Sequence, residues 1–458
     1  SVTTIMQALL VLPACAAALH IDMFVASRSS PSVRVVSRAS PPSASATISS
    51  TTSAPFEKDE FNEVVMGTYG RFDLVVSHGK GCKLWDINGK EYLDFTAGIS
   101  TCALGHADDR LTAAVSEQMA KVHHVSNLYY IPQQGELAKR LLATNNLDRA
   151  FFCNSGAEAN EAAIKLARKH AHGRGVESPV IITALSSFHG RTLATITATG
   201  QPKYQEGFGP LVPGFEYVPY NDAAALKEAV GRLSGKQQLA AILFEPLQGE
   251  GGIRPGEVEF FQMARGLCDE TGALLMVDEV QTGMCRTGTF WGHQQLGVEV
   301  DVLTSAKALG GGVPIGAMLA KSHCDVFTPG THATTYGGNP LACAAGLAVF
   351  DAIEQDSLLE NVNERSAQLV GGLRGLQAKM PSVIADVRGW GLILGLELTE
   401  ECGVTAAALC ASVLSKGMLT VPAGATVLRL VPPLIVSEDE AAQALAILEE
   451  ALAELAPQ

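Results

Sequence analysis

The chain has 458 residues, of which 47% are hydrophobic, and its formal net charge is -14. This length suffices for a large hydrophobic core and predicts one large domain with a smaller one beside it. The negative charge argues against a general nucleic-acid-binding surface. The ten cysteines include no CxxC pair, so we expect reduced, mostly buried thiols rather than a disulfide framework or a metal site.

Residues 1–55 differ in composition from the rest of the chain. They are rich in Ser, Ala, Thr and Pro and contain one acid, Asp22, against arginines at positions 28, 34 and 38. This composition is typical of an organellar transit peptide. The apolar run at residues 8–19 has the length of a signal-peptide hydrophobic region, so a two-part presequence is an alternative. It is too short, and interrupted by a proline, to span a bilayer, and we expect no membrane partner. We predict an organellar targeting presequence, with a plastid favoured over a mitochondrion; the other alternative is a disordered tail.

The ordered part of the chain is expected to begin at residue 56. Residues 83–95 place alternating apolar positions on both sides of Asn88-Gly89, the strongest local signal for a β-hairpin. A helix is expected over residues 111–122. We assign residues 56–109 to an N-terminal segment that joins the small domain.

Residues 110–338 are expected to form the large domain. Its apolar runs are separated by helical segments, and they lie at residues 151–153, 180–183, 240–244, 273–277 and 300–303. This alternation indicates an α/β fold with a mostly parallel sheet flanked by helices. Ligands of such sheets bind at the carboxyl ends of the strands.

Two charged residues follow neighbouring apolar runs. Asp278 ends the run at 273–277, and Lys307 follows the run at 300–303, just before Gly310-Gly311-Gly312. An acid and a lysine leaving two strand ends beside flexible glycines suit an active site. Taken alone, Asp278 could equally cap a loop and Lys307 could be a solvated surface lysine.

Two further loops contain residues suited to binding a ligand. The strand at 151–153 turns through Ser155-Gly156 into a helix, and free N–H groups at a helix N-terminus favour a phosphate. Phe188 and Arg191 follow the strand at 180–183 and suit stacking on a flat ring and gripping a carboxylate. The simpler alternatives are an ordinary capped helix, a packed phenylalanine and a surface ion pair.

Six segments occur in a fixed order: NSGAEANEAAIKLAR, SFHGRT, EPLQGEGG, DEVQTG, SAKALGGG and HATTYGGNP. Together they resemble the class III aminotransferases of fold type I, which use pyridoxal 5'-phosphate (PLP). The resemblance extends from residue 56 to the C-terminus. It implies a large PLP-binding domain with a mostly parallel sheet and a smaller α+β domain.

The resemblance also assigns roles to residues. Lys307 matches the lysine that binds PLP covalently and then moves the substrate proton. Asp278 matches the carboxylate that keeps the ring nitrogen protonated. The other implied cofactor contacts are Gln281 at the ring hydroxyl, Phe188 on the ring face, Gly156 and Ala157 at the phosphate, and Thr335 at the phosphate of a neighbouring subunit. Thr335 therefore implies a homodimer with shared active sites.

Substrate contacts follow from the same resemblance. Arg191 and Thr334 match contacts to acetylornithine. Arg429 matches the arginine that holds the α-carboxylate of 2-oxoglutarate or glutamate, because a planar guanidinium binds a carboxylate through two parallel hydrogen bonds. Glu250 matches a glutamate that neutralises Arg429 when no carboxylate is bound there.

Within the family, the segments are most similar to the acetylornithine aminotransferases. This implies transamination between N2-acetyl-L-ornithine and 2-oxoglutarate, giving N-acetylglutamate 5-semialdehyde and glutamate, in arginine biosynthesis. Ornithine δ-aminotransferases share most of the segments, but Ile99 stands where they have a tyrosine that contacts ornithine, and His189 stands where they have a tryptophan. Activity on succinylornithine or 4-aminobutyrate, a mutase acting on glutamate 1-semialdehyde, and a non-catalytic scaffold are the remaining alternatives.

Residues 339–458 are expected to form the small domain together with a linking helix. Strands are predicted near 383–387, 392–398 and 427–431, with a tight turn at Arg388–Gly391 and a closing helix over 438–455. This lobe is expected to bring Arg429 over the cofactor and to gate substrate entry by its motion.

Overall fold

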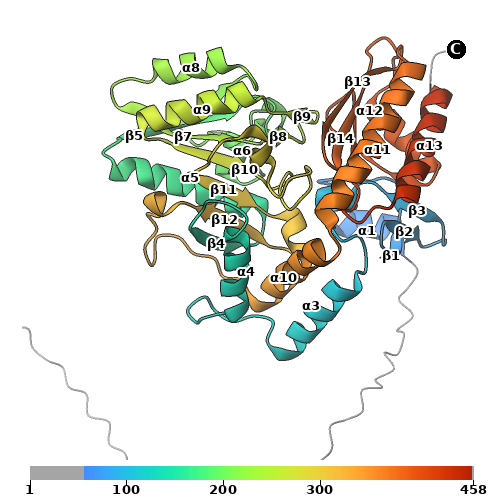
Figure 1. Ribbon diagram of the computed structural model, residues 1–458, viewed down its shortest axis with the longest axis horizontal. Helices are drawn as coiled ribbons and strands as arrows, with labels where there is room; N and C mark the ends of the chain where they lie inside the picture. The colour runs from blue at the N-terminus through green and yellow to red at the C-terminus, as the bar shows by residue number, and fades with distance from the viewer. Residues whose placement is uncertain (1–55, 456–458) are drawn as a thin grey trace, which may run out of the picture. The chain divides into compact units, whose positions relative to one another are not determined.

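The computed structural model describes residues 56–455 (Figure 1). The predicted targeting presequence at residues 1–55 lies outside the described residues. The chain divides into two units at Arg71–Phe72, and each is described by itself. The first contains helix α1 (Lys58–Val64), and every later helix and strand belongs to the second.

A seven-stranded sheet forms the centre of the second unit. In spatial order its strands are β4 (Arg149–Cys153), β12 (Gly316–Ala320), β11 (Val302–Ser305), β10 (Leu274–Asp278), β7 (Gln237–Phe244), β5 (Ser178–Ala184) and β6 (Phe215–Val218). Strand β12 is antiparallel to both of its neighbours, whereas β11, β10, β7, β5 and β6 pair in parallel. The predicted fold class, a mostly parallel α/β sheet, is confirmed.

The unbroken apolar run of β10 is explained by burial on both faces of the sheet. Leu274 and Met276 belong to one hydrophobic cluster with residues of helix α5 (Gly156–Gly173), while Leu275 and Val277 belong to another with helix α9 (Val258–Thr271). Helix α9 packs in turn against α8 (Ala223–Arg232). Figure 1 shows α5 on one side of these strands and α8 and α9 on the other. The three layers hold the carboxyl ends of β10 and β11 in fixed positions.

Three helices pack together beside the sheet. Helix α10 (Pro340–Gln355) contacts α3 (Asp109–Lys121), α4 (Pro132–Leu142) and the 3₁₀ turn η2 (Lys307–Gly310). Helix α3 confirms the prediction at 111–122 and begins slightly earlier, because the Asp108 carboxylate caps it by accepting a hydrogen bond from Leu111 N. The contact between α10 and η2 fixes the turn that starts with Lys307.

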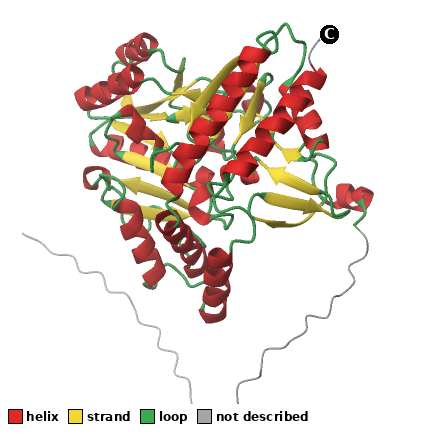
Figure 2. Ribbon diagram, turned by 45° about the vertical axis from the view of Figure 1, so that its right-hand side comes forward, coloured by secondary structure: helices red, strands yellow, loops and turns green. Residues whose placement is uncertain are grey.

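The C-terminal part builds a second sheet, two of whose strands are labelled on the right of Figure 1, and Figure 2 shows the molecule turned by 45° with strands in yellow and helices in red. The strand order of this sheet is β13 (Ile384–Trp390), β14 (Ile393–Leu398), β17 (Val427–Leu430) and β16 (Val421–Pro422). The packed helices are α11 (Leu358–Lys379), α12 (Ala406–Ser415) and α13 (Glu438–Leu455). The predicted tight turn between β13 and β14 is present, but it lies at Gly391-Leu392 rather than at Arg388–Gly391, because β13 runs through Trp390, which pairs with Ile393. Arg388 pairs with Gly395 in the ladder, and its guanidinium donates to Gly252 O at 2.6 Å.

The predicted hairpin is confirmed as strands β2 (Lys83–Asp86) and β3 (Glu91–Asp94). The Asp86 carboxylate accepts hydrogen bonds from the backbone N–H groups of Asn88 and Lys90, which holds the turn. Strand β1 (Val76–Lys80) pairs with β2, and β15 (Met418–Leu419) pairs in parallel with β3. The N-terminal segment thus shares a sheet with a strand of the C-terminal part. The domain boundaries at residues 109 and 338 stay predictions.

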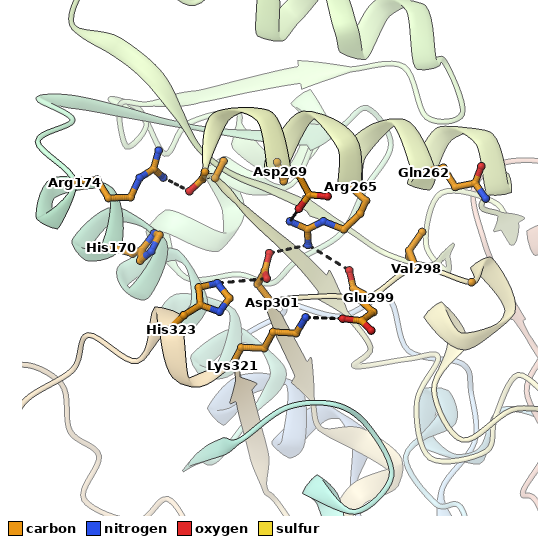
Figure 3. A pocket seen from close by; sticks show the side chains of 14 residues that line it. His170, Arg174, Gln262, Arg265, Asp269, Val298, Glu299, Asp301, Lys321 and His323 are labelled. Carbon is orange, nitrogen blue, oxygen red and sulfur yellow. Dashed lines mark hydrogen bonds and ion pairs between the residues drawn. The ribbon is translucent and has the colours of Figure 1, made fainter.

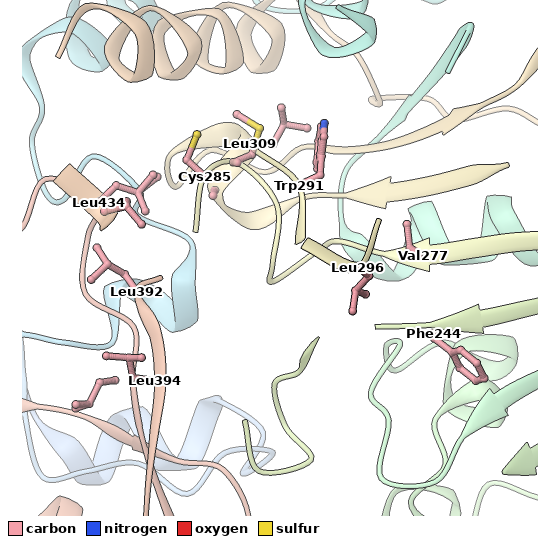
Figure 4. Packing of buried hydrophobic residues seen from close by; sticks show 14 of the residues in the cluster. Phe244, Val277, Cys285, Trp291, Leu296, Leu309, Leu392, Leu394 and Leu434 are labelled. Carbon is pink, nitrogen blue, oxygen red and sulfur yellow. The ribbon is translucent and has the colours of Figure 1, made fainter. Parts of the chain in front are cut away.

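One hydrophobic cluster joins the seven-stranded sheet to the C-terminal sheet (Figure 4). It contains Phe244 and Val277 of the seven-stranded sheet together with Leu392, Leu394 and Leu434 of the C-terminal part. Of the nine cysteines described, all are unpaired and only Cys102 is not fully buried, as expected. Within residues 56–455, no helix has both the length and the apolar character needed to cross a bilayer. The shorter elements are α2 (Ala97–Ser100), α6 (Leu193–Ala198), α7 (Pro202–Gln205), β8 (Leu247–Gln248), β9 (Arg254–Pro255), η1 (Gly292–Leu296) and η3 (Ser322–Cys324).

Candidate active site

A cavity of about 400 Å³ opens at the carboxyl ends of the parallel strands. It is bounded by the residues that follow β4, β5, β7, β10 and β11, so it occupies the sheet edge expected for a ligand site. Seven residues predicted from the sequence line it together: Gly156, Ala157, Phe188, Arg191, Asp278, Gln281 and Lys307.

The Asp278 carboxylate is held from behind by three donors. Its Oδ2 accepts from Asn160 Nδ2 at 2.7 Å and lies 2.8 Å from His189 Nδ1, while Oδ1 accepts from Val280 N at 3.0 Å. Thr304 Oγ1 donates to Asn160 Oδ1 at 2.7 Å and orients that amide. Because Asp278 is only 4% exposed, these bonds fix the direction of its carboxylate.

Asn160 and His189 were missed as partners of Asp278 by the sequence reasoning. Asn160 lies one helical turn after Gly156, on the same face of α5, so its position relative to the cavity could have been inferred. Nothing in the local sequence around His189 indicates that its ring lies beside Asp278, since the two residues come from different strands.

Lys307 combines an unusual backbone with an unusual charge environment. It is a non-glycine residue with φ 45°, the left-handed region that L-residues adopt at a cost. Burial lowers the pKa of its amine, and the nearby Arg429 lowers it further, against the opposing effects of Glu250, Asp278 and Glu245. A lowered pKa leaves more of the amine neutral, which is the form that acts as a nucleophile or base.

Glu245 is a second buried carboxyl group in the cavity wall. It accepts hydrogen bonds from the backbone of Phe188 at 3.0 Å and of Gly249 at 3.3 Å, and so joins two of the loops that line the cavity. Burial, opposed by His189 and reinforced by the charge of Asp278, raises its pKa to about 7. A raised pKa means that the Glu245 carboxyl group keeps its proton to a higher pH than an exposed glutamate would.

The N-terminus of α5 forms another wall. Ser155 caps the helix by accepting from Glu158 N at 3.2 Å, so Gly156 and Ala157 begin the helix at the cavity. A Cβ on Gly156 would lie 2.7 Å from a methyl group of Val280, which explains the glycine. The first N–H groups of a helix lack intrahelical acceptors, and with the helix dipole they favour an anion.

The buried Arg429 forms an ion pair with the partly exposed Glu250 next to the cavity. Arg429 lies on β17 and is 2% exposed, and its Nη1 lies 2.8 Å from Glu250 Oε1. The same nitrogen donates to Gln281 Oε1 at 3.2 Å, and Gln281 lines the cavity. The predicted pairing of these two residues is therefore present, and Gln281 connects the pair to the cavity wall.

Three residues weighed from the sequence do not reach the cavity within one chain. Thr334 and Thr335 line a separate hollow with residues of the 124–138 segment, and Thr334 approaches the site only through a contact of its hydroxyl with Asn154. Ile99 is 39% exposed and does not line the cavity. The roles assigned to these residues stay predictions.

A hollow of about 740 Å³ at the opposite edge of the sheet is rich in charge (Figure 3). Its charged groups pair with one another: Arg265 lies 2.8 Å from both Asp301 and Asp269, and Lys321 lies 2.9 Å from Glu299. Since these charges are already neutralised by their neighbours, the cavity around Lys307 is the better candidate for chemistry.

Comparison with known proteins agrees with this assignment. The family model for aminotransferase class-III matches residues 66–452. Acetylornithine aminotransferase from Thermosynechococcus vestitus is 61% identical over 403 residues, which cover 88% of this chain and 98% of the relative. An N-acetylornithine aminotransferase structure from Stenotrophomonas maltophilia is 38% identical with a TM-score of 0.73, covering 84% of this chain and 97% of that one. An ornithine aminotransferase structure from Toxoplasma gondii, which has PLP at partial occupancy in its active site, is 32% identical with a TM-score of 0.82 and covers 87% and 95%.

The family match covers most of the chain, and the relative from Thermosynechococcus vestitus is similar over nearly its whole length. The resemblance read from the six sequence segments is confirmed. The chain belongs to the class-III aminotransferase family, a family of PLP-dependent enzymes, and it is an aminotransferase.

Proposed function

We propose that the chain transfers an amino group from N2-acetyl-L-ornithine to 2-oxoglutarate, with PLP bound in the cavity around Lys307. The relatives named acetylornithine aminotransferase support this substrate pair. The observation on which the proposal mainly depends is the buried Arg429–Glu250 pair beside the cavity.

The cavity residues fit PLP in charge and shape. A buried carboxylate with a fixed direction, Asp278, suits a protonated ring nitrogen, and Phe188 supplies an aromatic face. The N-terminus of α5 at Gly156 suits a phosphate. Lys307 supplies an amine with a lowered pKa in the same cavity. When bound, PLP supplies an electron sink for the bond that loses its proton.

The side chains of this protein then have distinct tasks. The neutral amine of Lys307 would take the proton from the substrate carbon that bears the amino group and deliver it to the aldehyde carbon of PLP. The carboxylate of Asp278 holds a proton on the ring nitrogen because its own charge is stabilised by Asn160 and His189. Arg191 at the rim offers a guanidinium to a substrate carboxylate.

The Arg429–Glu250 pair explains how one cavity takes two differently shaped substrates. With acetylornithine bound through its side-chain amine, no carboxylate reaches Arg429, and Glu250 neutralises the buried guanidinium. With glutamate or 2-oxoglutarate bound, the α-carboxylate replaces Glu250. A buried arginine without either partner would cost several kcal/mol, on the order of the 3–5 kcal/mol measured when one partner of a buried pair is removed.

The experiment is a donor comparison with 2-oxoglutarate as acceptor. Glutamate formation is measured with acetylornithine, ornithine, succinylornithine and 4-aminobutyrate in turn, and Lys307→Ala serves as the inactive control. We expect acetylornithine to have the highest kcat/KM. A higher value for ornithine would favour ornithine aminotransferase activity, which the fold similarity to the Toxoplasma gondii structures also allows. Amino-group movement without any 2-oxoglutarate would indicate a mutase instead.

We also propose a homodimer with shared active sites. Leu128, Tyr129 and Tyr130 are 89%, 69% and 104% exposed in the single chain. Leu128 lines the same hollow as Thr334 and Thr335, so an unusually apolar exposed segment adjoins the two threonines that the resemblance assigns to the site of a neighbouring subunit. A second subunit that covers this surface would bury all of them.

Mixed dimers test whether Thr335 serves the neighbouring site. Lys307→Ala and Thr335→Val subunits are co-expressed with different tags, and the mixed dimer is isolated. If Thr335 acts across the interface, one of the two sites has both native residues, and activity rises well above that of either homodimer. If Thr335 acts within its own subunit, both sites of the mixed dimer are defective and no such rise occurs.

For residues 1–55, we propose that they direct the protein to an organelle, with a plastid favoured. Their composition and the start of the family match at residue 66 support this. A fluorescent protein carrying residues 1–55 should accumulate in plastids of a plastid-bearing cell; mitochondrial accumulation would favour the alternative, and a cytosolic signal would contradict the proposal.

A further inference from the structure

Arg191 stands at the rim of the cavity without any ionic partner. Among the residues that the structure describes, none gives its guanidinium a hydrogen bond or an ion pair; its contacts are with two aromatic rings. Its Cζ lies 4.0 Å from the centroid of the Tyr204 ring and 5.4 Å from that of Phe188. A cation over an aromatic face is attracted to it while its N–H donors stay free.

Tyr204 is itself held in place. Its ring meets Phe188 edge to face, with centroids 5.7 Å apart and planes at 81°. It belongs to helix α7, and two glutamine side chains anchor this segment: Gln201 Nε2 donates to Ser187 O, and Gln205 Nε2 donates to Thr199 O, each at 2.9 Å. The ring therefore has a fixed position relative to the loop that carries Phe188 and Arg191.

We propose that Tyr204 is the positioning residue for Arg191: its ring holds the guanidinium at the cavity rim, ready for a substrate carboxylate. This rests on the proposed function, in which Arg191 binds that carboxylate. An exposed arginine otherwise samples many rotamers, and fixing it on binding costs free energy. A ring that restricts it in advance reduces this cost and improves affinity without taking part in the chemistry.

Tyr204 lies outside the six sequence segments. The phenol oxygen has no hydrogen bond among the described contacts, so the ring alone performs the task. Lys203 approaches the same ring, with its Nζ 4.7 Å from the centroid, but it does not line the cavity. It therefore provides a matched cationic control beside the same ring.

The test compares Tyr204→Leu, Tyr204→Phe and Lys203→Met in the full-length enzyme loaded with its cofactor. Loss of a cation–ring contact predicts that Tyr204→Leu raises the KM for both acetylornithine and the keto-acid acceptor about 2- to 30-fold, with kcat within about twofold of the parent. Tyr204→Phe should restore the parent KM, and Lys203→Met should leave it unchanged. A KM equally raised by Lys203→Met would mean that rim charge, not the ring, sets affinity, and would overturn the proposal.

A double-mutant cycle then separates positioning from general structure. In the Arg191→Met background, Tyr204→Leu should add nothing to the KM, because its effect passes through Arg191. A further loss of similar size, or a fall in kcat with unchanged KM, would show that Tyr204 acts elsewhere. Should acetylornithine prove not to be the donor of the parent enzyme, the proposed substrate fails, whereas the same cycle, measured with the keto-acid acceptor as the varied substrate, still decides the role of Tyr204.

Discussion

Replacing Glu250 by Gln should change the relative use of the two substrates. The substitution removes the only carboxylate within reach of Arg429 among the described residues. The guanidinium keeps two neutral acceptors, Gln281 Oε1 at 3.2 Å and Pro422 O at 3.5 Å. Arg429 is 2% exposed, so water cannot replace the lost charge.

The size of the effect follows from burial. Breaking a buried ion pair by removing one partner costs about 3–5 kcal/mol. The Glu250 side chain is 24% exposed and Gln281 remains in place, so we expect about 1–3 kcal/mol here. This corresponds to roughly a 5- to 150-fold change in an equilibrium or rate ratio.

The substitution should change kcat/KM mainly for one of the two half-reactions. With acetylornithine bound, Arg429 has no carboxylate in the variant, but neither has it in the free variant enzyme, so kcat/KM for the donor half-reaction should change little. With 2-oxoglutarate bound, the substrate supplies the missing carboxylate and no longer has to displace Glu250, so kcat/KM for the acceptor half-reaction should increase. The ratio of the two values should therefore shift toward the acceptor by the factor above.

The assay is stopped-flow absorbance of each half-reaction, measured separately at several substrate concentrations. Glu250→Asp keeps the charge on a shorter side chain and should lie between the parent and Glu250→Gln. If Glu250→Gln lowers both half-reactions equally, or changes neither, Glu250 does not exchange with a substrate carboxylate and the reasoning fails.

Three further predictions concern stability. Gly389→Ala should lower the free energy of unfolding, measured in urea, by several kcal/mol, because φ is 128° and a Cβ would lie 2.1 Å from Ile393 O. Gly371→Ala, on the open face of α11, should instead raise the free energy of unfolding by at most about 1 kcal/mol. Leu448→Ala, a fully buried site on α13, should cost about 2–5 kcal/mol, and a loss below 1 kcal/mol would contradict the packing described. Glu245→Gln should become more stable relative to the parent as pH rises. In the folded parent the buried Glu245 has a pKa of about 7 and stays protonated, while in the unfolded chain it ionises near pH 4.5. The free energy of unfolding of the parent therefore falls between these two pH values and is constant above them. A difference in melting temperature that is independent of pH from 5 to 8 would contradict this last expectation.

The sequence reasoning succeeded where the signal was local. The hairpin around Asn88-Gly89 is specified by its own turn, where Asp86 accepts the backbone N–H groups. The apolar run of β10 indicated burial on both faces. The turn between β13 and β14 was predicted, but too early in the chain: the pairs Arg388–Gly395 and Trp390–Ile393 extend β13, and a bond from Arg388 to the distant Gly252 O supports the extended backbone.

Contacts between distant segments also explain which residues of the site the sequence did not predict. Motif similarity located Lys307 and Asp278, and the structure places both on one cavity. It gave no indication of Asn160, Glu245 or Tyr204, because their roles depend on which side chains from distant segments meet. The antiparallel direction of β12 and the pairing of β15 with β3 are likewise set by the packing of the whole unit rather than by any local pattern.

His189 provides the clearest test of how much the surroundings of Asp278 matter. Its ring is buried, with Nδ1 2.8 Å from Asp278 Oδ2, and its Nε2 has no partner among the described residues. A carboxylate oxygen accepts hydrogen bonds, so the geometry suits Nδ1 as the donor. A hydrogen bond to a charged group contributes about 1.5–3 kcal/mol, so His189→Leu should lower kcat by up to roughly 10- to 150-fold if the direction of Asp278 sets the rate. The amide nitrogen of His189→Asn can take the place of Nδ1 and should recover most of that loss, although it fills less space. Melting temperature separates this role from packing, since leucine fills about the same space as histidine and asparagine fills less. If both lose stability and neither loses kcat, then Asn160 and Val280 N are sufficient to hold Asp278, and the imidazole serves only to fill the interior.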